Sequence, residues 1–182
     1  PDYAYAYNDR GSAKRMIEDY SGAEADYLQA IKLQPGLSLI YNNLGSVQRK
    51  MNKNEDALRS FTNAIQFNPN YYIAYNNRGS VYYDMANYEE AEKDFKKSIQ
   101  INAKYAFAYN NLANTKMKQM KWEEAVEIYT KAISLNPKYG YAIQNRGNAY
   151  ELLRNSEKAC ADWKLAADLG IESSKSYLSE CK

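Results

Sequence analysis

A five-residue motif recurs at a fixed interval along this chain and constrains its fold more than any other feature. Its copies are Tyr7–Gly11, Tyr41–Gly45, Tyr75–Gly79, Tyr109–Ala113 and Ile143–Gly147, each beginning 34 residues after the one before. A repeat of this length is typical of stacked helix-turn-helix units, each of which needs its neighbours to bury its apolar face. The chain is therefore expected to be an array of similar helix pairs.

The motif divides most of the chain into five repeats. With the motif glycine set as position 8, they are residues 4–37, 38–71, 72–105, 106–139 and 140–173. Small residues at positions 8, 20 and 27 let two helices approach closely, and an aromatic ring at position 24 fills the remaining space. A breaker near position 32, usually proline, ends the second helix. We expect helix A over positions 1–14 and helix B over about positions 16–31 of each repeat.

This pattern resembles the tetratricopeptide repeat family over residues 4–173. Tyrosine stands at position 4 where the family has tryptophan, and Ala103 and Ile171 replace two prolines. The resemblance implies an all-α, right-handed superhelical solenoid of five helix-turn-helix repeats, followed by a C-terminal capping helix at about residues 173–182. It also implies that residues 1–182 form a single domain and that the A helices line a concave groove.

The composition excludes several classes of function. The 24 basic and 22 acidic residues are interleaved and give a net charge of +2, so no basic stripe is present for a nucleic acid. The chain has no histidine, only two cysteines and no glycine-rich phosphate loop. Neighbouring carboxylates such as Glu89 and Glu90 are expected near the start of helix B, where the helix dipole favours them. We predict no catalytic residue, no metal, no cofactor and no enzymatic activity.

No run of apolar residues approaches the roughly 20 that a membrane-spanning helix needs. We therefore expect a soluble segment that does not insert into a membrane. The chain begins at Pro1 rather than methionine, and we expect it to be part of a longer protein.

Side-chain amides dominate the positions that the resemblance places in the groove. The candidate peptide-binding residues at position 5 are Asn8, Asn42, Asn76 and Asn110, and those at position 6 are Asn43, Asn77, Asn111 and Asn145. Apolar candidates at position 2 are Leu39, Ile73 and Phe107, while small polar residues at position 9 are expected to keep the groove accessible.

Asparagine is a mediocre helix former, so two adjacent asparagines repeated in mid-helix suggest a function. An amide offers one acceptor and two donors, which can pair with the backbone of an extended peptide. Position 6 resembles the asparagine ladder of some tetratricopeptide superhelices. Two alternatives stay open, most evenly for position 5: the asparagines are inherited with the duplicated repeat, or they bond between adjacent A helices. If position 6 binds a ligand, alanine at Asn77 and Asn111 should weaken binding with little change in stability.

A second binding mode known in the family is a carboxylate clamp that holds acidic C-terminal tails with lysine and arginine. The matching positions in the first three repeats are Asn8, Ser12, Asn43, Ile73 and Asn77. The cations are missing, and neutral donors bind a carboxylate about half as strongly as charged ones. Binding of a tail carboxylate is therefore disfavoured.

The resulting interpretation is a protein-protein interaction scaffold that binds an extended polypeptide segment in the groove. Two alternatives remain: a self-assembling module, which would form a homo-oligomer, and the substrate-recruiting arm of a larger enzyme.

Cys160 and Cys181 are predicted to be neighbours and candidates for a disulfide. Gly170 is expected to end the last helix B. The cysteines lie 10 and 11 residues on either side of it, so an antiparallel hairpin would place them at the same height. A disulfide would indicate an oxidising, extracytoplasmic compartment, whereas two thiols would fit the cytoplasm.

Position 7 alternates between arginine and leucine, and position 23 changes in step with it. The arginine repeats carry Arg10 with Asp26, Arg78 with Asp94, and Arg146 with Asp162. The leucine repeats carry Ser60 and Ile128 at position 23. We predict an ion pair between helices A and B of the first, third and fifth repeats.

Overall fold

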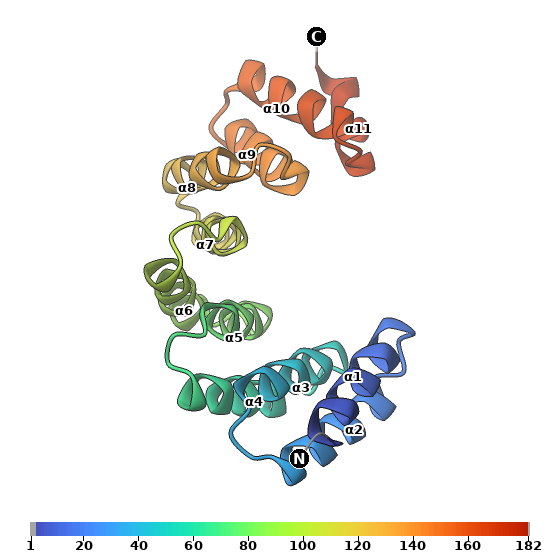
Figure 1. Cartoon of the computed structure of the whole chain (residues 1–182). Coiled ribbons are helices and arrows are strands. Elements are labelled where there is room, and N and C mark those ends of the chain that lie inside the picture. Colours follow the sequence, from blue (N-terminus) through green and yellow to red (C-terminus); the bar gives the residue numbers. More distant parts are fainter. Residues whose placement is uncertain (1–2, 182) are drawn as a thin grey trace. The chain divides into compact units, whose positions relative to one another are not determined.

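The structure is a computed structural model that describes residues 3–181, and its helices follow one another in pairs (Figure 1). The helices are α1 (Tyr3–Met16), α2 (Tyr20–Leu33), α3 (Ser38–Lys50), α4 (Asn54–Phe67), α5 (Tyr72–Asp84), α6 (Tyr88–Ile101), α7 (Ala106–Lys118), α8 (Trp122–Leu135), α9 (Gly140–Leu152), α10 (Ser156–Asp168) and α11 (Glu172–Tyr177), followed by the 3₁₀ helix η1 (Leu178–Glu180). Within residues 3–181 there is no strand, so the predicted all-α fold of tandem helix pairs is confirmed.

The chain divides into two compact parts. Residues up to Ile101 form the N-terminal body, with α1 to α6, and residues from Asn102 form the C-terminal body, with α7 to η1. Up to α9 the odd-numbered helices are the A helices of the five repeats, and up to α10 the even-numbered ones are the B helices. The single domain predicted over residues 1–182 stays a prediction.

Close packing inside each helix pair depends on the small residue at position 8. In the second repeat, a Cβ atom on Gly45 would lie 2.9 Å from Cε1 of Phe61. Phe61 is fully buried together with Ala57 and Ala64, the small residues at positions 20 and 27. The ring of helix B therefore packs directly against the backbone of helix A, as the repeat pattern predicts.

The turn between helices A and B takes the same strained form in every repeat. Position 15 has a positive φ between 58° and 62°, and its residues are Glu18, Asn52, Ala86, Met120 and Arg154. The following N–H bonds the carbonyl five residues back, for example Lys121 N to Lys116 O at 3.0 Å. This is a Schellman ending, which usually has glycine at the left-handed position. The residue pattern does not predict this turn, because none of the five residues is glycine.

The C-terminal helix is shorter than predicted and continues the repeat. Gly170 has φ 87° and Ile171 N bonds Ala166 O, so the predicted end of the last helix B is confirmed. The expected helix at about residues 173–182 is α11 followed by the single turn of η1. α11 packs on α10 as each A helix packs on the preceding B helix within a body. It therefore occupies the place of a sixth helix A, with Tyr177 at position 4.

None of the helices that the structure describes is long and apolar enough to cross a membrane.

Candidate functional site

The A helices lie next to one another within each body and form a face that we call the A-helix face. It consists of α1, α3 and α5 in the N-terminal body and of α7 and α9 in the C-terminal body. Position 2 of these helices is occupied by large apolar residues. Leu39 and Phe107 are exposed, and Ile73 is half-buried. These three predicted residues are therefore accessible to a ligand.

Phe107 is part of an aromatic cluster on the C-terminal body. Its ring centroid lies 5.0 Å from that of Tyr139 and 5.5 Å from that of Tyr105. Burial raises the pKa of Tyr139 to about 12, so this phenol stays neutral even above the usual tyrosine pKa of about 10. The cluster offers uncharged ring surface to a ligand.

The asparagines of position 5 are buried rather than presented to solvent. The side chains of Asn8, Asn42, Asn76 and Asn110 are buried, and so is that of Gln144 in the fifth repeat. Asn8, Asn42 and Asn110 accept hydrogen bonds from the next A helix of the same body, which is the structural alternative that the sequence left open. This geometry does not place Asn8, Asn42, Asn76 and Asn110 where a peptide backbone could contact them.

The asparagines of position 6 are half-buried, and Asn43, Asn77 and Asn145 bond to position 5 of the preceding repeat. Asn43 donates to Asn8 Oδ1 at 2.9 Å and Asn77 donates to Asn42 Oδ1 at 3.0 Å. In the C-terminal body Asn145 donates to Asn110 Oδ1 at 3.4 Å and to Asn114 Oδ1 at 3.1 Å. The amide row therefore links neighbouring A helices. Removing these amides should lower stability, contrary to the expectation from the sequence.

The row also leaves hydrogen-bonding capacity for a ligand. An amide has two N–H donors and a carbonyl oxygen with two lone pairs. Asn77 uses one donor toward Asn42, and its oxygen accepts one long bond of 3.4 Å from Asn76. Asn111 accepts from Asn110 at 3.3 Å in the same manner. Position 6 can therefore serve both the fold and a bound backbone.

Position 9 bonds the aromatic ring of position 24, a role that the sequence analysis missed. Ser12 Oγ lies 3.1 Å from Tyr27 Oη, and Trp163 Nε1 donates to Asn148 Oδ1 at 2.8 Å. Where the ring is phenylalanine, as in the second repeat, the position 9 hydroxyl bonds its own helix instead, Ser46 Oγ to Asn42 O at 2.8 Å. The signal was available, because asparagine occurs at position 9 only opposite Tyr129 and Trp163.

A polar pocket opens on the A-helix face of the N-terminal body. Its volume is about 340 Å³, and Ser46, Arg49, Lys50, Asn77 and Asp84 contribute to its lining. Arg49 Nε donates to Asp84 Oδ2 at 2.6 Å across the gap between α3 and α5. Lys50 leaves the pocket with one positive charge in excess.

The predicted ion pairs between helices A and B are confirmed in all three arginine repeats. Nε and Nη2 of each arginine donate to the two carboxylate oxygens of its aspartate at 2.6–2.9 Å. Arg78 and Arg146 also donate to Thr62 and Thr130 of the preceding helix B. In the first repeat, the hydrogen bond from Arg10 lowers the pKa of Asp26 to about 2. These pairs stabilise the fold rather than form a reactive centre.

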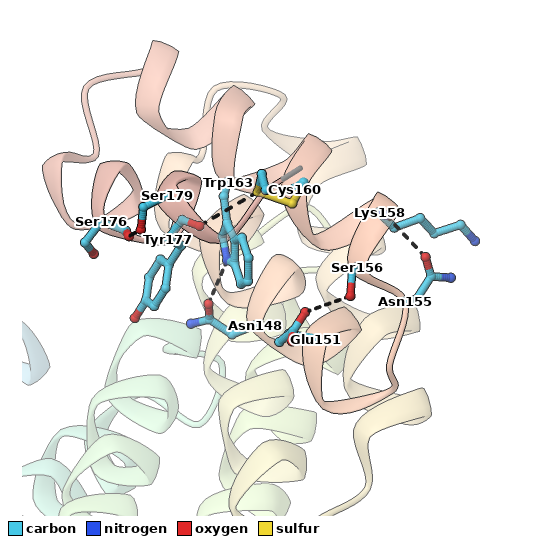
Figure 2. The surroundings of a disulfide bond; sticks show 11 residues. Asn148, Glu151, Asn155, Ser156, Lys158, Cys160, Trp163, Ser176, Tyr177 and Ser179 are labelled. Carbon is cyan, nitrogen blue, oxygen red and sulfur yellow. Dashed lines mark hydrogen bonds between the residues drawn. A yellow bond between two sulfur atoms is a disulfide. The ribbon is translucent and has the colours of Figure 1, made fainter.

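Cys160 and Cys181 are joined by a disulfide, with their Cα atoms 5.7 Å apart (Figure 2). The bond connects α10 to the residue that follows η1, so it ties the C-terminal helix to the last repeat. Among the residues that the structure describes, no cluster of histidine, cysteine, aspartate or glutamate could hold a metal ion.

Comparison with known families identifies the repeat. Models described as tetratricopeptide repeat match residues 4–36, 72–105, 106–139 and 128–161, and a model described as TPR repeat matches residues 45–86. A search of curated proteins finds no match.

Several solved structures have the same fold. A MamA protein is 26% identical, with 96% of this chain and 95% of that chain covered and a TM-score of 0.76. PilF of Pseudomonas aeruginosa is 19% identical, with 92% and 76% covered and a TM-score of 0.86. YrrB, described as a TPR protein with an unusual peptide-binding site, is 17% identical, with 96% and 90% covered and a TM-score of 0.72.

Proposed function

The chain belongs to the tetratricopeptide repeat family and is a protein-interaction scaffold, and we propose that its A-helix faces bind an extended polypeptide segment. The proposal is carried by one observation: half-buried amides at position 6 stand near exposed apolar residues at position 2 of the same helices. YrrB, a protein of the same fold, is described as having a peptide-binding site.

In the proposed mechanism, position 6 binds the peptide backbone and position 2 contacts the peptide side chains. Asn43 and Asn77 each use one N–H donor toward the preceding repeat, and their second donors and remaining lone pairs, with the carbonyl oxygen of Asn145, pair with peptide N–H and C=O groups, which every sequence offers. Leu39, Ile73 and Phe107 contact alternate side chains and select among sequences. The amides are already fixed by bonds to their neighbours, so little side-chain entropy is lost when the ligand binds.

The test uses a matched pair of leucines in the N-terminal body. Peptides of about twelve residues are selected from a display library, and their Kd is measured by fluorescence anisotropy. Leu39 is 46% exposed on the A-helix face, while Leu28 is 50% exposed on α2, outside this face. Leu39→Ser should weaken binding about tenfold, because a buried leucine side chain is worth about 1.5–3 kcal/mol. Leu28→Ser should leave it unchanged, and equal effects of the two variants would refute the proposal.

Hydrogen bonding to the backbone is tested on the ligand, because alanine at position 6 also disturbs the fold. Replacing one peptide N–H of a selected peptide by an ester oxygen removes a donor and keeps the side chains. At about 0.5–1.5 kcal/mol per hydrogen bond, the Kd should rise roughly 2- to 12-fold at the contacted residues. Esters without effect along the whole peptide would mean that the amides do not bind its backbone.

Self-assembly through α1 is a second candidate, favoured by a surface pocket on this helix. The Arg10 side chain is 59% exposed, against 19% for Arg78 and 18% for Arg146. The latter two lie against the preceding helix B through Thr62 and Thr130. Arg10 lies beside Tyr3 and Tyr7 around a surface pocket of about 250 Å³, which a second copy could fill. The third role predicted from the sequence, a substrate-recruiting arm of an enzyme, stays a prediction.

A further inference from the structure

Another pocket lies beside the C-terminal helix. Its volume is about 300 Å³, and it is lined by Asn148, Glu151 and Leu152 of α9, Trp163 of α10 and Tyr177 of α11. In Figure 2 the rings of Trp163 and Tyr177 lie side by side, with Asn148 below the indole.

Flat aromatic and aliphatic surfaces form most of this pocket. The Trp163 and Tyr177 ring centroids are 4.9 Å apart and the rings are tilted by 23°, which is a stacked arrangement. Trp163 is buried, and its N–H is satisfied by Asn148 Oδ1 at 2.8 Å. Tyr177 remains half-buried and Leu152 is exposed, so both offer surface to a ligand.

Glu151 is the single charged residue of the lining. It is half-buried, and among the described residues its carboxylate accepts only from Ser156 Oγ, at 3.4 Å. No described cation forms an ion pair with it. A cationic ligand would therefore meet a carboxylate that is not yet neutralised.

The polar pocket of the N-terminal body occupies the same place in its repeat. Both pockets are lined by positions 9, 12 and 13 of helix A and by the aromatic ring of position 24. Positions 12 and 13 are Arg49 and Lys50 in the first pocket, but Glu151 and Leu152 in the second. The same site thus carries opposite charge in the two bodies, which suits side chains of opposite charge.

We propose that the pocket beside α11 binds an arginine side chain of the polypeptide. A guanidinium group is planar and weakly hydrated, stacks on aromatic rings and pairs with a carboxylate through two parallel hydrogen bonds. Tyr177 supplies the ring, Glu151 supplies the carboxylate, and Leu152 contacts the aliphatic stem. This inference deepens the proposed function, on which it rests, by naming one side chain of the ligand.

The disulfide ties down the helix that supplies the second wall of this pocket. Tyr177 lies on a six-residue helix, and Cys181, four residues later, is bonded to Cys160 of α10. Such a short helix has little stability of its own. The pocket is therefore tested in the oxidised protein.

The experiment titrates the full chain with N-acetyl-arginine methylamide and follows the two indole N–H signals by ¹⁵N NMR. The signal of Trp163 should shift and saturate, while that of Trp122 should not move. The uncharged isostere N-acetyl-citrulline methylamide should bind at least fivefold more weakly. Glu151→Gln keeps the shape of the pocket and should weaken the arginine probe by a similar factor.

Three results would overturn the inference: no binding of the arginine probe, equal affinity for arginine and citrulline, or a Glu151→Gln variant that binds the arginine probe as well as the parent. The proposed function is judged separately, by Leu39→Ser and selected peptides in the other body. If Leu39→Ser weakens those peptides but the arginine probe does not bind, this inference fails and the proposed function stands. If the arginine probe binds but Leu39→Ser has no effect on peptide binding, this inference stands and the proposed function fails.

Discussion

At the scale of single residues, the three arginine–aspartate pairs show how a repeat protein holds buried charge. Asp26, Asp94 and Asp162 are buried, and each carboxylate accepts two hydrogen bonds from its arginine. The repeats between them replace both partners together, with Leu112 and Ile128 as an apolar example. Neither arrangement leaves a buried charge unpaired, whereas an aspartate without its arginine would be a buried charge without a partner.

Arg78→Leu should therefore destabilise the protein more than Arg78→Leu combined with Asp94→Ile. The single variant leaves the buried Asp94 carboxylate unpaired and should lower the free energy of unfolding by about 2–4 kcal/mol. The double variant copies the Leu112–Ile128 pair of the fourth repeat and should recover at least ~1 kcal/mol of that loss. Urea unfolding measures both, and equal losses would show that the two residues are not coupled.

Asp26 should contribute stability that disappears in acid. Its folded pKa of about 2, lowered by the hydrogen bond from Arg10, lies below the usual value of about 3.9. Between about pH 4 and pH 2 the unfolded chain therefore binds the proton more readily, and stability falls as the pH falls. The contribution should be about 1–2 kcal/mol, because the exposed Arg10 is screened by solvent.

The measurement compares the parent with Asp26→Asn in urea at several pH values. The difference in unfolding free energy should be constant above about pH 5 and shrink toward pH 2. A difference that does not change with pH would argue against an ionised Asp26 as its source.

At the scale of the helix pair, the turn between helices A and B is a place where sequence and backbone disagree. Position 15 is left-handed in all five repeats, although Asn52 is the only residue there that tolerates this conformation well. The packing of helix A on helix B imposes it, since the turn must close over buried rings.

Met120→Gly should stabilise the protein by about 0.5–1 kcal/mol, because glycine adopts a positive φ without steric cost. Met120 is highly exposed, so little packing is lost. Asn52→Gly is the control and should change stability by no more than a few tenths of a kcal/mol. Thermal or urea unfolding of both variants checks this, and a loss at Met120→Gly would contradict the idea that the turn is strained.

Reduction of the disulfide should loosen the C-terminal helix specifically. The bond closes a loop with a sequence separation of 21 residues, and removing it should cost about 2–3 kcal/mol. Hydrogen exchange in the Cys160→Ser, Cys181→Ser variant should accelerate in α11 and η1, while α1 and α2 keep their rates. Unchanged exchange in α11 would mean that packing alone holds this helix.

At the scale of the whole molecule, the two candidate functions differ in the oligomeric state that they predict for the purified chain. A scaffold that waits for a ligand should remain a single chain, whereas a surface around Arg10 that fits a second copy should make the mass depend on concentration. Amide-rich A-helix faces are present in both bodies. These faces favour a single chain in solution, because they do not need a second copy of the protein as a partner.

Light scattering after size exclusion should therefore give the mass of one chain across a hundredfold range of concentration. A mass that rises toward that of two chains would favour self-assembly. In that case Tyr3→Glu, at the exposed pocket on α1, should restore the single-chain mass, whereas Leu165→Ser on α10 should not.

The sequence by itself determined the helix pairs, their close-packed positions and the charge pairs. These features repeat at one interval, and each depends on contacts inside one hairpin, where position 7 faces position 23 and Gly45 faces Phe61. Local spacing fixes such contacts, so the pattern of residues is sufficient. The end of the last helix B at Gly170 followed from the same local rule.

Only the tertiary structure decided how the asparagines are used. Positions 5 and 6 have the same side chain and the same helix propensity, but Asn42 is buried between helices and Asn77 reaches it from the next repeat. The partner lies 35 residues away in sequence, so no local pattern reveals the bond. The left-handed turns and the aromatic wall at Tyr177 likewise depend on how helices stack. The physical reason is common to all three: packing between helices places a side chain or bends a turn against its local preference.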